Sequence, residues 1–316
     1  MKAGRLISLQ VAAFALALLV SSLVVHSALY IAPGDPLKVL SAGRGLTPEA
    51  EAALREQYNL DDPFFSRYVS WLTDLVQGEM GTSILQNADV SALIGPRLSS
   101  TLLLLAMASV LMVVVGVGLG LAAGLGGKWL DAGVRAVSSL GIATPSFVAA
   151  IVLIAIFSVG LGWFPVFGSG DGLPDQVYHL ILPAIALAMV QWSSIARVTR
   201  IAVRTEADRE HVETARSRGL PESAIIRRHV LRNAMIPIST IAGLTIAGTI
   251  AATIVVETAF ALNGLGSLLV DSVTSKDFAV VQAVSMIYVA FFLIVNILVD
   301  LSYALLDPRI RTGGPR

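Results

Sequence analysis

Six long stretches of the chain contain no Asp, Glu, Lys or Arg. An α-helix rises 1.5 Å per residue, so about 20 residues cross the ~30 Å hydrocarbon layer of a membrane. Each stretch is longer than that, and its apolar residues form a continuous run instead of one helical stripe. The pattern predicts an all-α integral membrane protein with six transmembrane helices, at residues 6–34, 98–127, 136–170, 176–196, 233–256 and 278–299.

The first stretch has two possible interpretations. Lys2 and Arg5 precede an apolar run, as they would in a secretory signal peptide. The uncharged run exceeds the 7–15 residues of a signal's apolar region, which favours a retained membrane helix. We therefore expect a first transmembrane helix at 1–34, an external helical insertion at 35–97, and a transmembrane core at 98–316 with a polar loop at 197–235.

One helix of the insertion has recognisable ends. Asp62 is expected to cap its start, Pro63 suits the first helical position, and Gly78 is placed to end it. Its apolar residues fall on one stripe. The stripe is expected to lie on the outer mouth of the membrane domain or on lipid headgroups, and the sequence leaves both open.

The distribution of basic residues predicts the orientation. If the N-terminus is cytoplasmic, sixteen of the 22 Lys and Arg residues lie on the cytoplasmic side. Nine of these are arginines in the segment 197–232. Because positive charge accumulates on the cytoplasmic side of membrane proteins, both termini and this segment are expected there.

Two features of the spans predict helix contacts and breaks. Gly116, Gly120 and Gly124 recur every four residues, a spacing that lets another helix approach closely. The run 136–170 is too long for one helix, and GLGWFPVFG at 160–168 is expected to break it. After the fifth span, the apolar stretch that follows Glu257 is too short to cross, so we expect a partly buried surface element there.

Composition agrees with a membrane protein and offers little catalytic chemistry. The chain is 55% hydrophobic and 14% charged, against about 25% charged in soluble domains, and it has no cysteine. Its four histidines lack metal-ligand spacing, and GLGGKW departs from a nucleotide-binding loop at Trp129. We expect no catalytic activity, no bound metal and no cofactor in this chain. The span centres also carry no charge, which disfavours an ion-driven carrier.

The cytoplasmic segment predicts a short helix at 205–219. Acidic residues come early and basic residues late, which complements the helix dipole, and Gly219 is placed to end the helix. Pro221 then suits the start of a second helix. Ala215 and Gly219 lie one turn apart and would leave a shallow spot for another protein. A simple loop with topology-setting arginines is the open alternative.

The same segment resembles the E-A-A-x-x-x-G signature of the permease subunits of ATP-binding cassette importers, with Thr in place of the first alanine. In that family the signature forms a coupling helix that docks on a cytoplasmic ATPase. The resemblance therefore implies ATPase-coupling roles for Glu213, Thr214, Ala215, Arg218, Gly219 and Leu220.

Further motifs narrow the resemblance to the dipeptide, oligopeptide and nickel permeases with a long first external loop. These motifs are APGDPL (32–37), YNLDDPFFSRYVSWL (58–72), GEMGTS (78–83), RHVLRNAMIP (228–237) and DLSYALLDPRIR (300–311). At position 263 this sequence has Asn where relatives commonly have proline. The resemblance therefore does not predict the shape of the outer loop at this point, although it still supports the family.

The resemblance implies a multi-pass protein of the bacterial inner membrane that forms half of a peptide translocation pathway. The implied partners are a homologous permease subunit, two ATPases or a fused pair that bind ATP and Mg²⁺, and an external substrate-binding protein. Membrane lipid is also a partner, and nucleic acid is not.

Polar residues inside the spans are candidates for the pathway. Such residues also form hydrogen bonds between helices, so their role stays open. Three rival interpretations also remain: import of nickel or another chelated metal by the same architecture, an ion-driven secondary transporter, and a membrane scaffold. The candidates for the pathway are Gln191, Ser193, Ser194 and Asn296.

Overall fold

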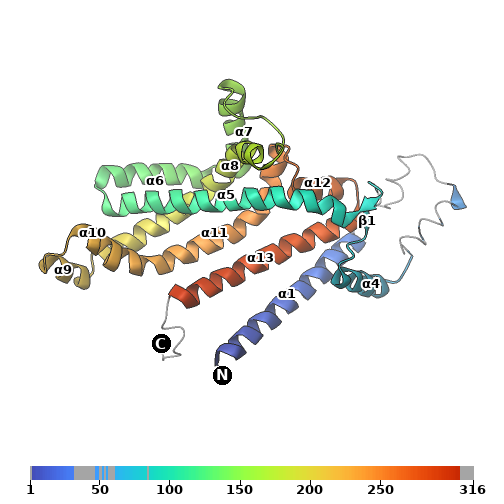
Figure 1. The fold of residues 1–316 in the computed structure, drawn as a ribbon, viewed down its shortest axis with the longest axis horizontal. Coiled ribbons are helices and arrows are strands. Elements are labelled where there is room, and N and C mark those ends of the chain that lie inside the picture. The colour runs from blue at the N-terminus through green and yellow to red at the C-terminus, as the bar shows by residue number, and fades with distance from the viewer. Residues whose placement is uncertain are drawn as a thin grey trace. The chain divides into compact units, whose positions relative to one another are not determined.

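The computed structural model describes residues 2–31, 47–49, 52, 55, 61–83 and 85–306, with side chains between 11 and 299. Helices dominate, as predicted (Figure 1). The motif APGDPL and most of the first half of the predicted insertion lie outside the described residues. The elements are α1 (Lys2–Ile31), α4 (Phe64–Gln77), β1 (Thr82–Ser83), β2 (Ala88–Asp89), α5 (Val90–Leu125), α6 (Lys128–Ala143), α7 (Ser146–Leu153), the π-helical turns η1 (Ile154–Gly160), α8 (Leu173–Ala207), α9 (Glu210–Ser217), α10 (Glu222–Ile225), the π-helical turns η2 (Ile226–Leu231), α11 (Arg232–Ala259), α12 (Leu265–Thr274) and α13 (Phe278–Leu306).

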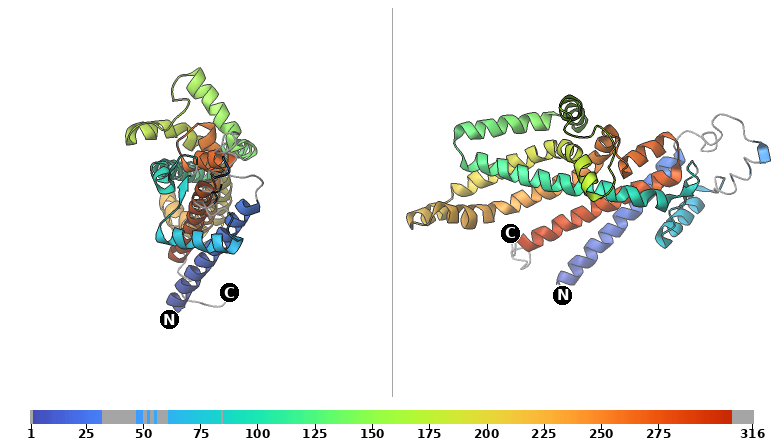
Figure 2. Two further views of the ribbon diagram at one scale, coloured as in Figure 1. Left: turned by 90° about the vertical axis from the view of Figure 1, so that its right-hand side faces the viewer. Right: turned by 45° about the horizontal axis from the view of Figure 1, so that its top comes forward.

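The six predicted spans are found as five single helices and one bent pair. α1, α5, α8, the continuous run α10–η2–α11, and α13 are each long and apolar enough to cross a membrane. The third span is divided between α6 and α7–η1, whose axes differ by 104°. Figure 2 shows α7 leaving the direction of α6.

The predicted break is confirmed, and a second break precedes it. The helical run ends at Gly160 and residues 161–172 are not helical, as GLGWFPVFG at 160–168 predicts. The earlier bend was not predicted: α6 already ends at Ala143. Pro145 has no backbone N–H and disfavours helical geometry in the residue before it. Thr144 accordingly has extended angles, φ −94° and ψ 112°, and a new helix starts at Ser146.

Contacts divide the chain into two compact units. Unit 1 contains residues 1–101 and 263–293, and unit 2 contains residues 102–262 and 294–316. The predicted domain limits at 34 and 97 are not tested by this division and stay a prediction.

In unit 1, ring contacts and one polar contact of His26 connect segments that are distant in the sequence. His26 of α1 lies 5.2–5.8 Å, ring centre to ring centre, from Phe64, Tyr68 and Trp71 of α4. Its Nδ1 is 2.8 Å from the amide nitrogen of Gln282 on α13. The antiparallel pair β1–β2 places Thr82 opposite Asp89.

α4 and α12 test the predictions for the external side. α4 begins one residue later than expected, since Pro63 is its N-cap and Asp62 lies before it. Gly78 ends the helix with φ +89°, as predicted. α12 is a ten-residue helix with Leu265 and Leu268 buried, which confirms a short, partly buried element.

Unit 2 is assembled around α8. One buried cluster combines α8 residues such as Leu180, Leu187 and Ile195 with residues of α5, α7 and α11. The predicted glycine face of α5 packs directly on α8: a Cβ at Gly116, Gly120 or Gly124 would lie within 2.4–3.0 Å of the side chains of Ile195, Thr199 and Val203, respectively. The close contact predicted from the glycine spacing is confirmed.

α6 packs on α8 through one glycine and through ion pairs of one carboxylate. A Cβ at Gly141 would lie 2.2 Å from the hydroxyl of Ser193. In the first turn of α6, the carboxylate of Asp131 is 93% buried and accepts two hydrogen bonds from the guanidinium of Arg200, one of them 2.8 Å long. Arg204 also donates to Asp131 at 3.3 Å.

These contacts predict different results for two neighbouring glycines of α5. A Cβ at Gly120 would lie 2.7 Å from the backbone oxygen of Ala196, which cannot move without shifting α8. Gly120→Ala should therefore destabilise the protein by about 1–3 kcal/mol, the usual cost of overpacking. Gly118→Ala is the matched control, because nothing lies within 4 Å of its Cβ position. Thermal unfolding in detergent checks both, and equal stability of the two variants would contradict the packing described.

Candidate functional site

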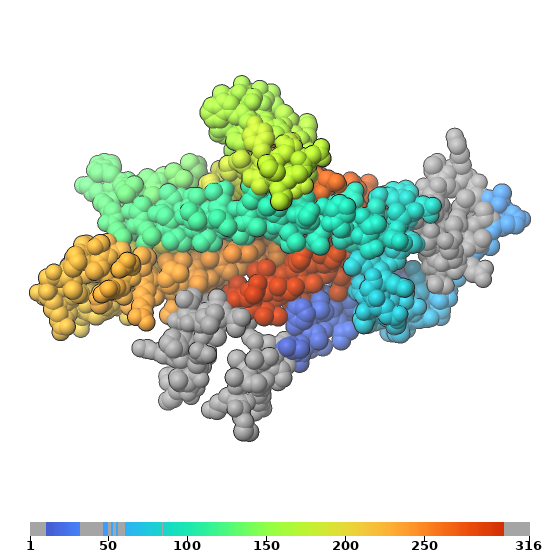
Figure 3. All heavy atoms as spheres, in the orientation of Figure 1, coloured from blue at the N-terminus to red at the C-terminus, as the bar shows by residue number. Residues whose placement is uncertain are grey.

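The arginine-rich segment forms one end of unit 2, where a short helix joins two long ones. α8 continues to Ala207, α9 covers Glu210–Ser217, and α10–η2–α11 runs without interruption from Glu222 to Ala259. The amber residues in Figure 3 show this end. The predicted limits 205–219 were too wide, because residues 205–207 complete the last turn of α8 and Arg209 has extended angles before α9.

Gly219 ends α9 in the way predicted. Its φ is +74°, a left-handed conformation that costs a residue with a Cβ about 1–2 kcal/mol. The N–H of Gly219 donates to the oxygen of Arg216 at 2.9 Å, and the N–H of Leu220 donates to that of Ala215 at 3.3 Å. This pair of bonds is a Schellman motif, which satisfies carbonyls that the helix end leaves without partners. Pro221 caps the following helix, as expected.

One face of α9 is packed into unit 2. Val212 and Ala215, three residues apart, are buried with Val203 of α8 and with Ile225 and Val230 of the following helices. The expectation that Ala215 and Gly219 share an exposed spot is wrong. Ala215 is only 4% exposed, because it faces inward one turn after Val212, whereas Gly219 lies beyond the end of the helix.

Ion pairs fix both ends of α9. Arg216 donates two hydrogen bonds to the carboxylate of Glu222, at 2.8 and 3.2 Å, which joins α9 to α10. The same hydrogen-bonded carboxylate raises the pKa of Arg216 above its ordinary value. At the other end, Glu206 of α8 lies 3.2 Å from Arg209 and 3.4 Å from the amide of Asn233 on α11. α9 is therefore held to the ends of both long helices.

The outer face of α9 and the turn after it carry the remaining residues of the predicted coupling set. These five residues, which are all the predicted residues except Ala215, are exposed. At Gly219 no atom lies within 4 Å of the position that a Cβ would take. The structure thus separates the six predicted residues into one buried anchor, Ala215, and an exposed group: Glu213, Thr214, Arg218, Gly219 and Leu220.

Gln191 of α8 lies at a pocket beside the bend of the third span. The pocket has a volume of about 310 Å³ and is lined by residues 142–146, by Leu187, Val190 and Gln191 of α8, and by Ala252 of α11. The half-buried Gln191 is its longest polar side chain. Gln191 was predicted from the sequence as a candidate for the pathway, but the proximity of Thr144 and Pro145 was not predicted.

The other pathway candidates are placed differently. Ser193 is fully buried, contacts α6 and donates to the carbonyl of Met189 at 3.1 Å, so it packs between helices. Ser194 and Asn296 are half-buried, and neither lines the pocket beside Gln191. The structure does not bring the four candidates together.

The role of Asp131 was not predicted from the sequence. This residue lies outside the uncharged stretches, and its burial under three arginines of α6 and α8 depends on the packing of unit 2. The one indication in the sequence is that Asp131 is a single acidic residue between the basic residues Lys128 and Arg135. Among the described residues, no three His, Cys, Asp or Glu side chains lie together as ligands for a metal ion.

Comparison with protein families identifies related proteins over nearly the whole chain. Residues 116–312 match the model for "binding-protein-dependent transport system inner membrane component", and residues 5–104 match the model for the N-terminal part of such components. The oligopeptide transport system permease protein AppB of Bacillus subtilis is 36% identical over 290 residues, which cover 88% of this chain and 90% of AppB. The glutathione transport system permease protein GsiC of Salmonella choleraesuis is 35% identical over 295 residues, covering 93% and 94%.

A solved structure shares the fold. A chain of the MetNI methionine ABC transporter, in inward-facing conformations, matches with a TM-score of 0.57 at 16% identity, over 67% of this chain and 95% of that one. The family models, the relatives and the helical fold agree with the sequence motifs. The chain belongs to the family of inner-membrane components of binding-protein-dependent transport systems, the permease subunits of ATP-binding cassette importers.

Proposed function

We propose that this permease subunit forms half of a pathway that imports peptides, and that α9 couples the pathway to a cytoplasmic ATPase. The observation that carries the proposal is the division of α9 into a packed inner face and an exposed outer face, between the ends of two long helices. The peptide cargo is supported by the names of relatives such as AppB and GsiC, an oligopeptide and a glutathione permease.

The construction of α9 suits a mechanical connection. A helix of eight residues is too short to be stable alone in water, so its position depends on tertiary contacts. Val212, Ala215 and the Arg216–Glu222 pair supply those contacts. A partner that moves the exposed face of α9 would therefore move the ends of α8 and α11 with it, as a rigid body.

The pocket beside Gln191 is our candidate for part of the pathway. Transport sites in membrane proteins often lie where a helix is interrupted, because the interruption frees backbone polar groups to face a cavity. Here α6 is interrupted at Thr144–Pro145, and the side-chain amide of Gln191 adds a donor and an acceptor. Both kinds of group can bind peptide bonds without selecting one side chain.

The remaining components are assigned to other chains. ATP and Mg²⁺ would bind to two ATPase subunits or a fused pair, and an external protein would deliver the peptide. A homologous permease subunit would supply the other half of the pathway. In this proposal the present chain has no catalytic role.

Substitution of Gly219 tests the coupling role. Gly219→Trp places a large side chain on the exposed turn, where nothing in the subunit lies within 4 Å, so the chain should fold and insert. ATPase co-purification and peptide uptake should fall at least ten-fold. Gly219→Asn is the control, because Asn tolerates the left-handed conformation and is small. Normal uptake by the Trp variant would rule out contact between this turn and the ATPase.

Loosening the inner face of α9 should separate ATP hydrolysis from import. Val212→Ser removes apolar contacts with the buried cluster and places a hydroxyl there. The exposed face is unchanged, so the ATPase should still bind, while peptide imported per ATP hydrolysed should fall several-fold in proteoliposomes. Val212→Ile keeps the inner face apolar and should preserve the ratio. An unchanged ratio in the Ser variant would show that movement does not pass through this packing.

The source of energy separates the proposal from an ion-driven transporter. In proteoliposomes containing the full complex, vanadate should abolish peptide uptake by blocking ATP hydrolysis. An ionophore that collapses ion gradients should leave it unchanged. The opposite pattern would support the ion-driven alternative. Uptake of nickel instead of peptide would show that the proposed cargo is wrong, while the ATP-driven mechanism would stand.

A further inference from the structure

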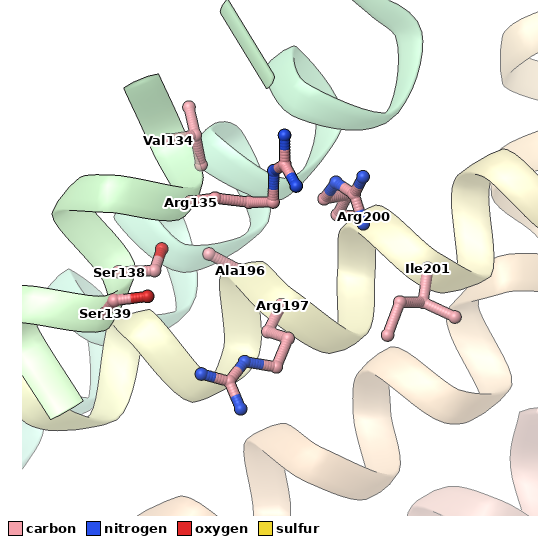
Figure 4. A pocket seen from close by; sticks show the side chains of 8 residues that line it. All are labelled: Val134, Arg135, Ser138, Ser139, Ala196, Arg197, Arg200 and Ile201. Atoms are coloured by element: carbon pink, nitrogen blue, oxygen red, sulfur yellow. The ribbon is translucent and has the colours of Figure 1, made fainter. Parts of the chain in front are cut away.

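A second pocket in unit 2 has the chemistry of a phosphate site. It lies between α6 and α8, has a volume of about 330 Å³, and is called here the Arg197 pocket (Figure 4). α8 contributes two arginines and α6 a third. The polar lining residues are Arg135, Ser138, Ser139, Arg197 and Arg200.

The charges around the pocket do not balance. Arg200 is paired with Asp131, whose carboxylate also lies 3.6 Å from Arg135 and 3.3 Å from Arg204. The single negative charge of Asp131 thus lies close to three positively charged guanidinium groups. Arg197 is exposed and has no hydrogen bond or ion pair with any residue that the structure describes. In Figure 4 its guanidinium extends on the opposite side of the pocket from those of Arg135 and Arg200. The pocket therefore has an excess of positive charge, which favours an anion.

A buried hydroxyl in the lining also lacks a partner. Ser138 is only 5% exposed, and its Oγ has no hydrogen-bond partner within the described part of the chain. A buried polar group without a hydrogen bond costs about 1–3 kcal/mol. Since α6 offers this hydroxyl at the wall of a pocket that holds arginines, a ligand oxygen is a suitable acceptor for it.

The level of the pocket in the membrane indicates where the anion comes from. Arg135 is the last charge before the uncharged stretch 136–170, and Arg197 is the first after the stretch 176–196. The 21 uncharged residues of α8 extend about 30 Å, the thickness of the hydrocarbon layer. Both arginines are thus at the boundary of this layer, where the phosphates of lipid headgroups lie. Basic pockets between transmembrane helices at this level bind anionic lipid headgroups.

We propose that the Arg197 pocket binds the phosphate of an anionic phospholipid, with Arg197 and the Ser138 hydroxyl as ligands of the phosphate oxygens. The headgroup would lie between α6 and α8, on the end of unit 2 that carries α9. Free phosphate shares the same chemistry and is the other possible source of the anion.

The test compares two ligands on the purified transporter complex in detergent. Short-chain phosphatidylglycerol and inorganic phosphate are titrated separately, and binding is followed by the shift in thermal unfolding. Wild type should bind phosphatidylglycerol. Arg197→Gln should weaken binding about five-fold, the usual contribution of one basic residue near anionic lipid. Ser138→Ala should weaken it a few-fold. Neither variant removes the Asp131–Arg200 contact.

Arg232→Gln is the matched control. Arg232 is exposed and is the last charge before the uncharged stretch 233–256, so it lies at a similar boundary, but it does not line the pocket. Its substitution should leave the affinity for phosphatidylglycerol within two-fold of wild type. This control distinguishes a pocket from general attraction of arginines to the lipid surface.

Each outcome decides the proposal. Inorganic phosphate that binds with the same dependence on Arg197 and Ser138 supports the site and identifies a soluble anion as a ligand. Binding of phosphatidylglycerol alone supports a lipid site. Equal losses in Arg197→Gln and Arg232→Gln, or no binding of either ligand, would overturn it. Without ligand, Ser138→Ala should unfold at or above the wild-type temperature, because it removes the unpaired hydroxyl; a lower temperature would show that the hydroxyl has a structural role instead.

Discussion

The close approach of α8 to glycines of α5 and α6 is the contact on which unit 2 depends. Lipid tails are as apolar as the helix surfaces, so helices in a membrane associate mainly through packing and polar contacts. Gly116, Gly120 and Gly124 bring the α5 backbone against α8, and Gly141 does the same for α6. Asp131 and Arg200 then fix the α6 contact at the end nearer to α9. The pocket beside Gln191, the Arg197 pocket and the attachment of α9 all lie along this one helix.

The length of α8 gives that arrangement a mechanical consequence. Its 35 residues extend about 50 Å, well beyond the hydrocarbon layer, without interruption. The run α10–η2–α11 is similarly long, with a π-helical segment near its start, and such segments are frequent at functional sites. α9 connects the adjacent ends of both. A displacement at α9 is therefore applied to two helices that reach the pocket beside Gln191, since Gln191 belongs to α8 and Ala252 to α11.

Much of this could be predicted from the sequence because the decisive signals are local. Uncharged runs define the spans, the four-residue glycine spacing defines a close helix contact, and Gly219 and Pro221 define the turn after α9. What the sequence did not predict depends on packing. The direction of Ala215 depends on which face of α9 meets Val203, and the burial of Asp131 depends on the neighbouring helix. The bend at Pro145 was available from the sequence, because a proline inside an apolar run limits the residue before it. The prediction relied on GLGWFPVFG alone, where the helical run does end, at Gly160, and it overlooked the earlier bend.

That bend bears on where a polar solute can pass. In hydrocarbon, backbone groups without hydrogen bonds are tolerated only where protein or a water-filled cavity covers them. Pro145 has no N–H for the carbonyl of Gly141, which receives only a 3.3 Å bond from Thr144. The same short stretch lines the pocket in which Gln191 lies. A cavity that admits water at this point would satisfy the freed backbone groups and offer a peptide the same donors and acceptors. In the function proposed above, the interruption of the third span and the polar side chain of α8 thus have a common explanation in one pathway-lining site.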